Sequence, residues 1–181
     1  MPLANPVGLE LLGRVQLTAQ AAGTAIVTIP ARDMLVIQAC VTGYQSGGGI
    51  FGLRFGTAEG AVLAATTNYW HRNHPTAITA VATWGTAVQV PSATMILLAN
   101  ANISLGRTSL FSIMNQNRTA HPCQWETVNE TGSAATIGVK NVGQGEFISP
   151  AAGQIRSVQM VVSGGNLNAG SGFSVFGTNL S

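Results

Sequence analysis

The sequence predicts an all-β protein folded as an antiparallel sandwich. Short segments alternate apolar and polar side chains, and turns rich in Gly, Asn and Pro separate them. No segment has the period of about 3.6 residues that marks an amphipathic helix. About eight to ten short strands, without a repeat of about 20 to 50 residues, favour a jelly-roll-like sandwich over a solenoid or a propeller.

Four strands are predicted near the start of the chain. Residues 11–20 alternate apolar and polar side chains, and a glycine turn leads from them into residues 24–29, so the two segments resemble a hairpin. Residues 34–44 form a long, almost continuously apolar strand that ends at the Gly-rich run 45–49. Residues 50–55 follow, with three apolar side chains on one face.

The middle of the chain is less regular. Residues 57–69 predict an irregular connection, and the stretch from Trp70 to Gly85 predicts a long exposed loop because it opens with Trp-His-Arg-Asn-His-Pro. Loops of that length are often functional. Strands then resume, and we expect them at residues 86–90, 94–98, 107–115, 123–128 and 134–140.

The last part of the chain predicts a closing β-hairpin. Residues 155–162 are mainly apolar, a Ser-Gly-Gly-Asn turn follows, and residues 172–177 alternate apolar and small side chains. No charged residue occurs after Arg156. An uncharged final strand of this kind belongs inside a sheet or between subunits, so we expect the end of the chain to be structural.

The composition predicts a surface that other protein copies cover. Charged residues make up 8% of the chain, whereas about 25% is usual. A monomeric protein normally keeps its surface charged to stay dispersed, so this scarcity indicates burial of the surface in a large assembly.

The same composition argues against several other classes of protein. The net charge is +2 and the eight Lys and Arg residues are scattered from Arg14 to Arg156, which does not favour nucleic-acid binding. The most apolar stretch, residues 34–41, is far shorter than the roughly 20 residues of a membrane helix, and the N-terminus does not resemble a secretory signal. We therefore expect folding in a cytosol, with Cys40 and Cys123 as buried free thiols.

Few residues offer catalytic chemistry. The chain has one Asp, Asp33, whose place in a turn predicts hydrogen bonds to nearby backbone amides, and one Lys, Lys140. His71 and His74 have a spacing that suits a metal site on a helix, but they lie in the predicted loop without further ligands. Nothing specific supports Cys123 as a nucleophile. We expect no enzymatic activity, no catalytic residue, no cofactor and no metal.

Two segments predict contacts with other proteins. Trp70 lies beside a histidine and an arginine in the predicted loop, which is the composition of an interface hot spot. Residues 1–8 are rich in Pro and Asn and predict an extended arm that precedes a single domain over residues 9–181. The candidate interface residues are Leu3, Pro6, Val7, Trp70, His71, Arg72 and Trp84.

Several stretches resemble a known group of proteins. The opening LLGRVQLTAQAAGTAIVTIPARDMLVIQACVTG contains two strands, a Pro-marked turn and a long apolar strand. FGLRFGTAEG, with Asn68 and Tyr69 after it, is similar to a segment L-x-F-N-G-D-x-G, and LFSIMNQNRTAHP to a strand followed by an Asn/Thr-rich turn. IRSVQMVVSGGNLNAGSGFSVFG resembles a closing hairpin that ends in an aromatic residue and Gly. Together these stretches resemble the small jelly-roll structural proteins of tailed bacteriophages, which include head decoration (cement) proteins and some tail or fibre modules.

The resemblance implies a function without catalysis. It implies a capsid decoration protein that binds the outer head surface of a virion, stabilises contacts between subunits of the major capsid protein, and associates as a homotrimer or homodimer after synthesis in the bacterial cytoplasm. The sequence departs from the group at Gly56, Thr57 and Ala58, where the group often has Asn and Asp, and at Phe176, where it has Tyr. A cation role for that Asp does not carry over.

An alternative of a different class stays open. A tail or fibre module could recognise a host surface glycan, with Trp70, His71, Arg72 and Trp84 on exposed loops as its platform, because aromatic faces suit sugar rings.

Overall fold

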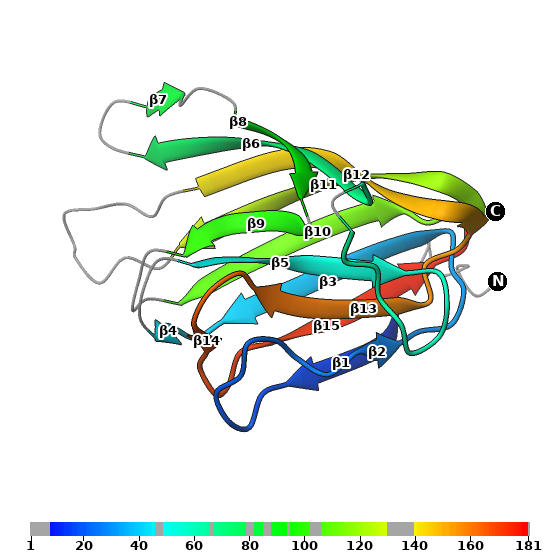
Figure 1. Ribbon diagram of the computed structural model, residues 1–181, viewed down its shortest axis with the longest axis horizontal. Coiled ribbons are helices and arrows are strands. Elements are labelled where there is room, and N and C mark those ends of the chain that lie inside the picture. The colour runs from blue at the N-terminus through cyan, green and yellow to red at the C-terminus, as the bar shows by residue number, and fades with distance from the viewer. Residues whose placement is uncertain are drawn as a thin grey trace, which may run out of the picture.

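The computed structural model describes residues 8–45, 49–65, 67–78, 82–84, 88–93, 95–101, 106–129 and 140–180. Of these, it describes the backbone alone at residues 44–45, 49–50, 73–78, 82–84, 88–93, 97–101, 129 and 140–141. The described residues form strands and no helix (Figure 1). The strands are β1 (Glu10–Gln16), β2 (Val27–Thr28), β3 (Met34–Val41), β4 (Tyr44–Gln45), β5 (Gly49–Gly56), β6 (Tyr69–Ile78), β7 (Ala82–Trp84), β8 (Val88–Ala93), β9 (Ile96–Ala101), β10 (Arg107–Met114), β11 (Arg118–Asn129), β12 (Lys140–Gly153), β13 (Ser157–Val162), β14 (Asn166–Leu167) and β15 (Gly172–Thr178).

Two antiparallel sheets make up most of the structure. The large sheet has nine strands in the order β1-β15-β3-β10-β11-β12-β6-β7, and β8 pairs with β6 beside this path. The small sheet has the order β2-β13-β5-β9, and β14 pairs with β4 in a separate two-stranded sheet. Every described pairing is antiparallel.

The small sheet packs across one face of the large sheet, and the core lies between them. Phe55 of β5 lies 5.5 Å from Phe111 of β10 and 5.7 Å from Phe147 of β12, measured between ring centroids. The Tyr69 hydroxyl of β6 donates a hydrogen bond to the carbonyl of Leu63 at 2.6 Å and accepts one from the amide of Phe55 at 2.9 Å. The prediction of an all-β antiparallel sandwich is thus confirmed.

The predicted hairpins at the two ends of the chain are wrong. Strand β13 belongs to the small sheet, whereas β15 lies inside the large sheet between β1 and β3. Likewise β1 pairs with β15 and β2 with β13, so the first two strands also lie in different sheets. Alternation of side chains marks a strand with one buried face, but it does not say which strand is its neighbour. The prediction that the final strand lies within a sheet is confirmed.

The predicted loop at Trp70 is also wrong. Residues 69–78 form strand β6, which pairs with β12 along its length. Tyr69 and His71 point towards the core, whereas Trp70 and Arg72 point away from it. This alternation is hard to recognise in the sequence because histidine is polar. Most of the predicted strand 134–140 lies outside the described residues, and β12 begins at Lys140.

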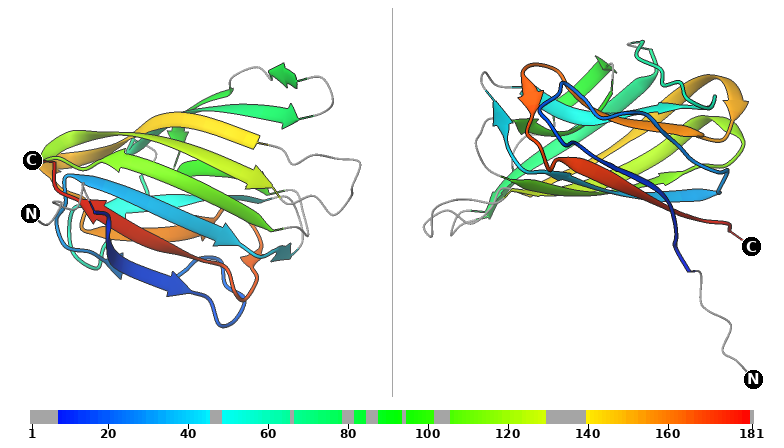
Figure 2. Two further views of the ribbon diagram at one scale, coloured as in Figure 1. Left: turned by 180° about the vertical axis from the view of Figure 1, so that it is seen from behind. Right: turned by 90° about the horizontal axis from the view of Figure 1, so that it is seen from below.

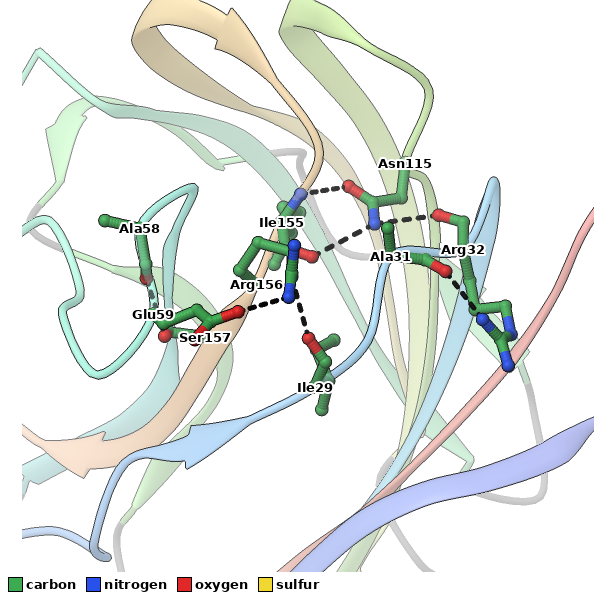
Figure 3. A network of polar contacts seen from close by, with 9 residues as sticks. All are labelled: Ile29, Ala31, Arg32, Ala58, Glu59, Asn115, Ile155, Arg156 and Ser157. Atoms are coloured by element: carbon green, nitrogen blue, oxygen red, sulfur yellow. Dashed lines mark hydrogen bonds and ion pairs between the residues drawn. The ribbon is translucent and has the colours of Figure 1, made fainter.

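A network of polar contacts joins the two sheets at one end of the sandwich (Figure 3). The Asn115 side chain is fully buried just after β10; its Nδ2 donates to the carbonyls of Arg32 at 2.9 Å and Ile155 at 3.3 Å, and its Oδ1 accepts from the amide of Ile155. Arg156 Nε donates to the carbonyl of Ile29 at 3.0 Å. Buried amide side chains that are fully hydrogen-bonded fix the relative positions of the segments they join.

Several of the chain's few charges gather at this end. Arg156 forms an ion pair with Glu59, and Arg32 forms one with Glu10. The Asp33 carboxylate accepts hydrogen bonds from Gln154 Nε2 at 3.2 Å and from the amide of Leu180 at 3.1 Å. Asp33 does accept a hydrogen bond from a backbone amide, as predicted. The donor is Leu180, however, which is far from Asp33 in the sequence, so the prediction of a nearby amide is wrong.

Candidate functional site

The face of the large sheet that points away from the small sheet is the candidate functional surface. The left view of Figure 2 looks onto it, and no other strand lies in front of it there. We call it the outer face. Its side chains are Leu11, Arg14, Gln16, Met34, Val36, Gln38, Cys40, Trp70, Arg72, Thr108, Leu110, Ser112, Met114, Pro122, Gln124, Glu126, Val128, Val142, Gln144, Glu146, Ile148, Ser174 and Phe176.

Large apolar side chains are concentrated on the outer face. Of the eight large apolar residues that are exposed in the described part of the chain, six lie here: Leu11, Trp70, Leu110, Val128, Val142 and Ile148. Leu110, in the middle strand β10, is 57% exposed. A concentration of large exposed apolar side chains on one face indicates a surface that contacts a partner.

The outer face carries few charges. Among the side chains that the structure describes on this face, four are Arg or Glu, namely Arg14, Arg72, Glu126 and Glu146. Most of the others are amides, hydroxyls or apolar groups. Depletion of charge together with exposed apolar and aromatic side chains is the composition of the central part of a protein–protein interface.

Three shallow hollows lie on the outer face. One lies over β1, β15 and β3, where Gly172 lacks a side chain and Arg14, Gln38 and Ser174 form the rim. The second and third lie over β10, β11 and β12 and share Gln124 and Gln144. Their linings are mostly neutral amides, hydroxyls and apolar groups, with one charged residue in the first (Arg14), one in the second (Glu126) and none in the third.

The ionisable groups with displaced pKa values lie on the opposite, inner face. His71 is fully buried, and burial lowers its pKa to about 4. His121 is fully buried too and stacks on Phe147 at 5.5 Å; burial lowers its pKa, against the opposing effect of nearby backbone groups of Met114 and Arg118. Burial raises the pKa of the Cys123 thiol, which makes it a poor nucleophile. These groups are parts of the core.

The described residues hold no group of three or more His, Cys, Asp or Glu that could bind a metal ion. Both cysteines are free, as predicted. Cys123 is buried as predicted, but Cys40 is exposed. The apolar strand β3 has one face in the core and the other on the outer face, and Cys40 points outward.

The residues predicted for an interface are separated by the structure. Trp70 and Arg72 point outward on β6, and Trp70 is 36% exposed. His71 between them is buried against Trp125, with ring centroids 6.1 Å apart, so its assignment to the interface is corrected. Trp84 lies on β7 and only its backbone is described. Leu3, Pro6 and Val7 of the predicted arm lie outside the described residues.

Sequence reasoning missed the apolar residues that dominate the outer face. Leu110 stands next to the core residue Phe111, and Val128 follows the buried Thr127. The sequence did contain a signal, which is the alternation of side chains between the two faces of a strand. In the segment RTSLFSIM, Leu110 shares one face with Thr108 and Ser112, whereas Phe111 and Ile113 lie on the other. An apolar residue out of phase with the core is a candidate for an interface.

No family model, curated protein or solved structure matches the chain. The described residues include no helix that is long and apolar enough to span a membrane. The functional conclusion therefore depends on the fold and the outer face.

Proposed function

We propose that the protein is a non-enzymatic structural protein of a phage virion, of the capsid decoration (cement) kind. In this function it attaches to the outer surface of the head and stabilises contacts between subunits of the major capsid protein. The observation that carries the proposal is the outer face, which holds six of the eight large apolar residues exposed in the described part of the chain and has few charges. Such a face suits a protein that is covered by other copies or partners in an assembly.

The strand order supports a jelly roll at the centre of this sandwich. Eight of the strands, taken in chain order, fall into two sets of four with the orders β1-β15-β3-β10 and β2-β13-β5-β9. Two facing four-stranded sheets that share the chain in this way are what a jelly roll, a fold of many viral coat proteins, would have. On this interpretation β6, β7, β8, β11 and β12 are additions that widen the large sheet. Among them β6 carries Trp70 and Arg72.

The ionisable groups support a function without catalysis. Of the buried ones, His71 and His121 belong to the packed interior, and Cys123 is held as a neutral thiol. The hollows hold at most one ionised side chain each, Arg14 in the first and Glu126 in the second. A surface built this way binds a partner by shape and by burial of apolar area, and many copies on one particle multiply a modest contact.

The test is the copy number of the chain in purified virus particles. Quantitative mass spectrometry against the major capsid protein measures it, and an unrelated protein of the host cytoplasm serves as the control for contamination. A number of copies in simple proportion to the capsid subunit is the expected result. A few copies per particle would replace the proposal with the tail or fibre module that binds a glycan, for which exposed Trp70 and Arg72 remain suitable. Absence from particles would overturn the virion function.

A further inference from the structure

We propose that a second copy of this chain covers the part of the outer face formed by β1, β15, β3, β10 and β11, in a dimer whose two-fold axis runs parallel to strand β3. The inference names the partner of the surface described above, and it rests on the proposed function only in that this surface is covered by protein. Three features of the face carry it: the position of two opposite charges, the residues along β3, and the extent of the surface.

The pairing register places one row of outward residues straight across five strands. Arg14 of β1 pairs with Ser174 of β15, Ser174 with Gln38 of β3, Gln38 with Leu110 of β10, and Leu110 with Glu126 of β11. Strand β3 is the third of these five. Arg14 and Glu126 therefore stand at equal distances, two strands each, on opposite sides of β3.

A two-fold axis parallel to β3 brings these charges together. When two copies pack face to face about such an axis, a residue two strands to one side of β3 faces the residue two strands to the other side in its partner. Arg14 of each copy then faces Glu126 of the other, so the dimer gains two equivalent ion pairs. Gln38 faces the Gln38 of the second copy, and its amide can both donate and accept a hydrogen bond across the axis.

The residues above and below this row suit the same arrangement. Val36 and Met34 also lie on β3 and meet their own counterparts as apolar contacts. In the next row Phe176 of β15 faces Ser112 of β10, because each lies one strand from β3 and both pair with Val36. Like charges do not face one another among these described positions on β1, β15, β3, β10 and β11. The contact along the axis therefore combines Met34 and Val36 with the Gln38 amides, and its charged pairs lie towards the sides.

The surface has the extent that a stable dimer needs. A specific interface of standard size buries about 800 Å² on each partner and uses about 20 to 30 residues a side. Of the outer-face side chains named above, 17 lie on the five strands, which is close to the lower end of that range. Sheets that pack face to face keep their strand directions within about 30° of each other, and an axis parallel to β3 aligns the two β3 strands within that range. Trp70, on β6, lies outside these five strands and stays accessible in the dimer.

The experiment measures self-association of the full chain by sedimentation equilibrium over about 1 to 100 μM. Arg14→Glu and Glu126→Arg are each expected to raise the dimer dissociation constant roughly tenfold or more, because each places two pairs of like charges across the interface. An equimolar mixture of the two variants is expected to dimerise like the original chain. In the mixed dimer the two substituted positions face each other with opposite charges, and the unchanged Arg14 of one copy faces the unchanged Glu126 of the other.

The mixture separates this proposal from other effects of the substitutions. Contacts within one chain would be lost in both variants and would not return on mixing. Ala61→Glu is the matched control, because Ala61 is exposed in the connection after β5 and lies away from the outer face. Circular dichroism of every variant checks that the fold is kept. A chain that stays monomeric over this range, or a mixture that does not recover, overturns the proposal.

A second measurement uses Cys40, which lies on β3 and is exposed. In the proposed dimer the two Cys40 thiols face each other across the axis, so a short bis-maleimide reagent should join two copies. Cys123 is buried and does not compete. Cross-linking should disappear in Cys40→Ala and fall in Arg14→Glu; its absence in a chain shown to dimerise would place the interface elsewhere.

A monomer that still binds particles would overturn the dimer alone, and a dimer absent from particles would overturn the virion function alone.

Discussion

Two histidines occupy inward positions of the large sheet, where apolar residues are usual. Both ring nitrogens of His71 and of His121 are buried without a hydrogen-bond partner in the described structure. A buried, unpaired imidazole is tolerated only in its neutral form, because the imidazolium loses its hydration without gaining an opposite charge. Aromatic packing compensates in part: His71 meets the edge of Trp125 and His121 stacks on Phe147.

These histidines predict that acid destabilises the fold. The pKa of His71 is about 4 in the folded chain and ordinarily 6.5, so between these values the unfolded chain binds more protons. The stability contributed by its neutral form is complete above about pH 6.5 and is lost as the pH falls towards about 4, by up to about 3 kcal/mol. Urea unfolding at several pH values measures it. His71→Phe should remove this part of the pH dependence; an unchanged slope between pH 7 and 4 would contradict the assignment.

At the scale of elements, a glycine sets how closely β5 and β9 approach. Gly52 lies in the middle of β5, where the pairing register with β9 shifts at Phe51 and Gly52. A Cβ atom at Gly52 would lie 2.2 Å from the carbonyl oxygen of Ile96 and 2.8 Å from Met95 Sδ. The first contact is with backbone, which cannot move without opening the strand pair. The glycine is therefore a packing requirement of the small sheet.

Gly52→Ala should lower the free energy of unfolding by about 2 kcal/mol or more, because β9 must shift away from β5. Gly164→Ala is the matched control, since nothing lies within 4 Å of the position its Cβ would take. Urea denaturation of both variants, followed by tryptophan fluorescence, measures the difference. Equal stabilities of the two variants would show that the strand pair accommodates the methyl group.

At the scale of the whole molecule, one core holds the two sheets together. Phe55 is fully buried on β5 of the small sheet and touches aromatic rings on β10 and β12 of the large sheet. The core cluster takes residues from strands near both ends of the chain, from Ile29 to Val175. Most stabilising contacts thus join segments far apart in the sequence, which predicts slow, cooperative folding.

Phe55→Ala should destabilise both sheets in a single transition, by about 3 to 5 kcal/mol, because it removes a ring from the interior between them. Circular dichroism reports the strands of both sheets, and tryptophan fluorescence reports the large sheet, whose strands carry Trp70, Trp84 and Trp125, so the two signals can be compared in one urea titration. We expect their midpoints to coincide and to move together in the variant. Separate midpoints would mean that the sheets unfold independently.

Much of this protein was predictable from local pattern. Alternation identified the strand class, and it placed Phe51, Leu53 and Phe55 on one face of a strand; all three are buried, because the side chains of a strand alternate between its two faces. The scarcity of charge predicted a covered surface. The candidate site was predicted only in part: Trp70 and Arg72 do lie on an exposed face, but His71 between them points into the core.

The sequence by itself determined that the chain is all-β, that its strands have one buried face, and that it carries few charges and little catalytic chemistry. The tertiary structure alone decided which strands are neighbours, such as β1 beside β15, where Glu10 pairs with Gly177. It also decided that Leu110 and Val128 meet on one outer face with Arg14 and Glu126 in register. The physical reason is that alternation is a property of adjacent residues, whereas pairing and packing depend on contacts between segments that the sequence keeps far apart.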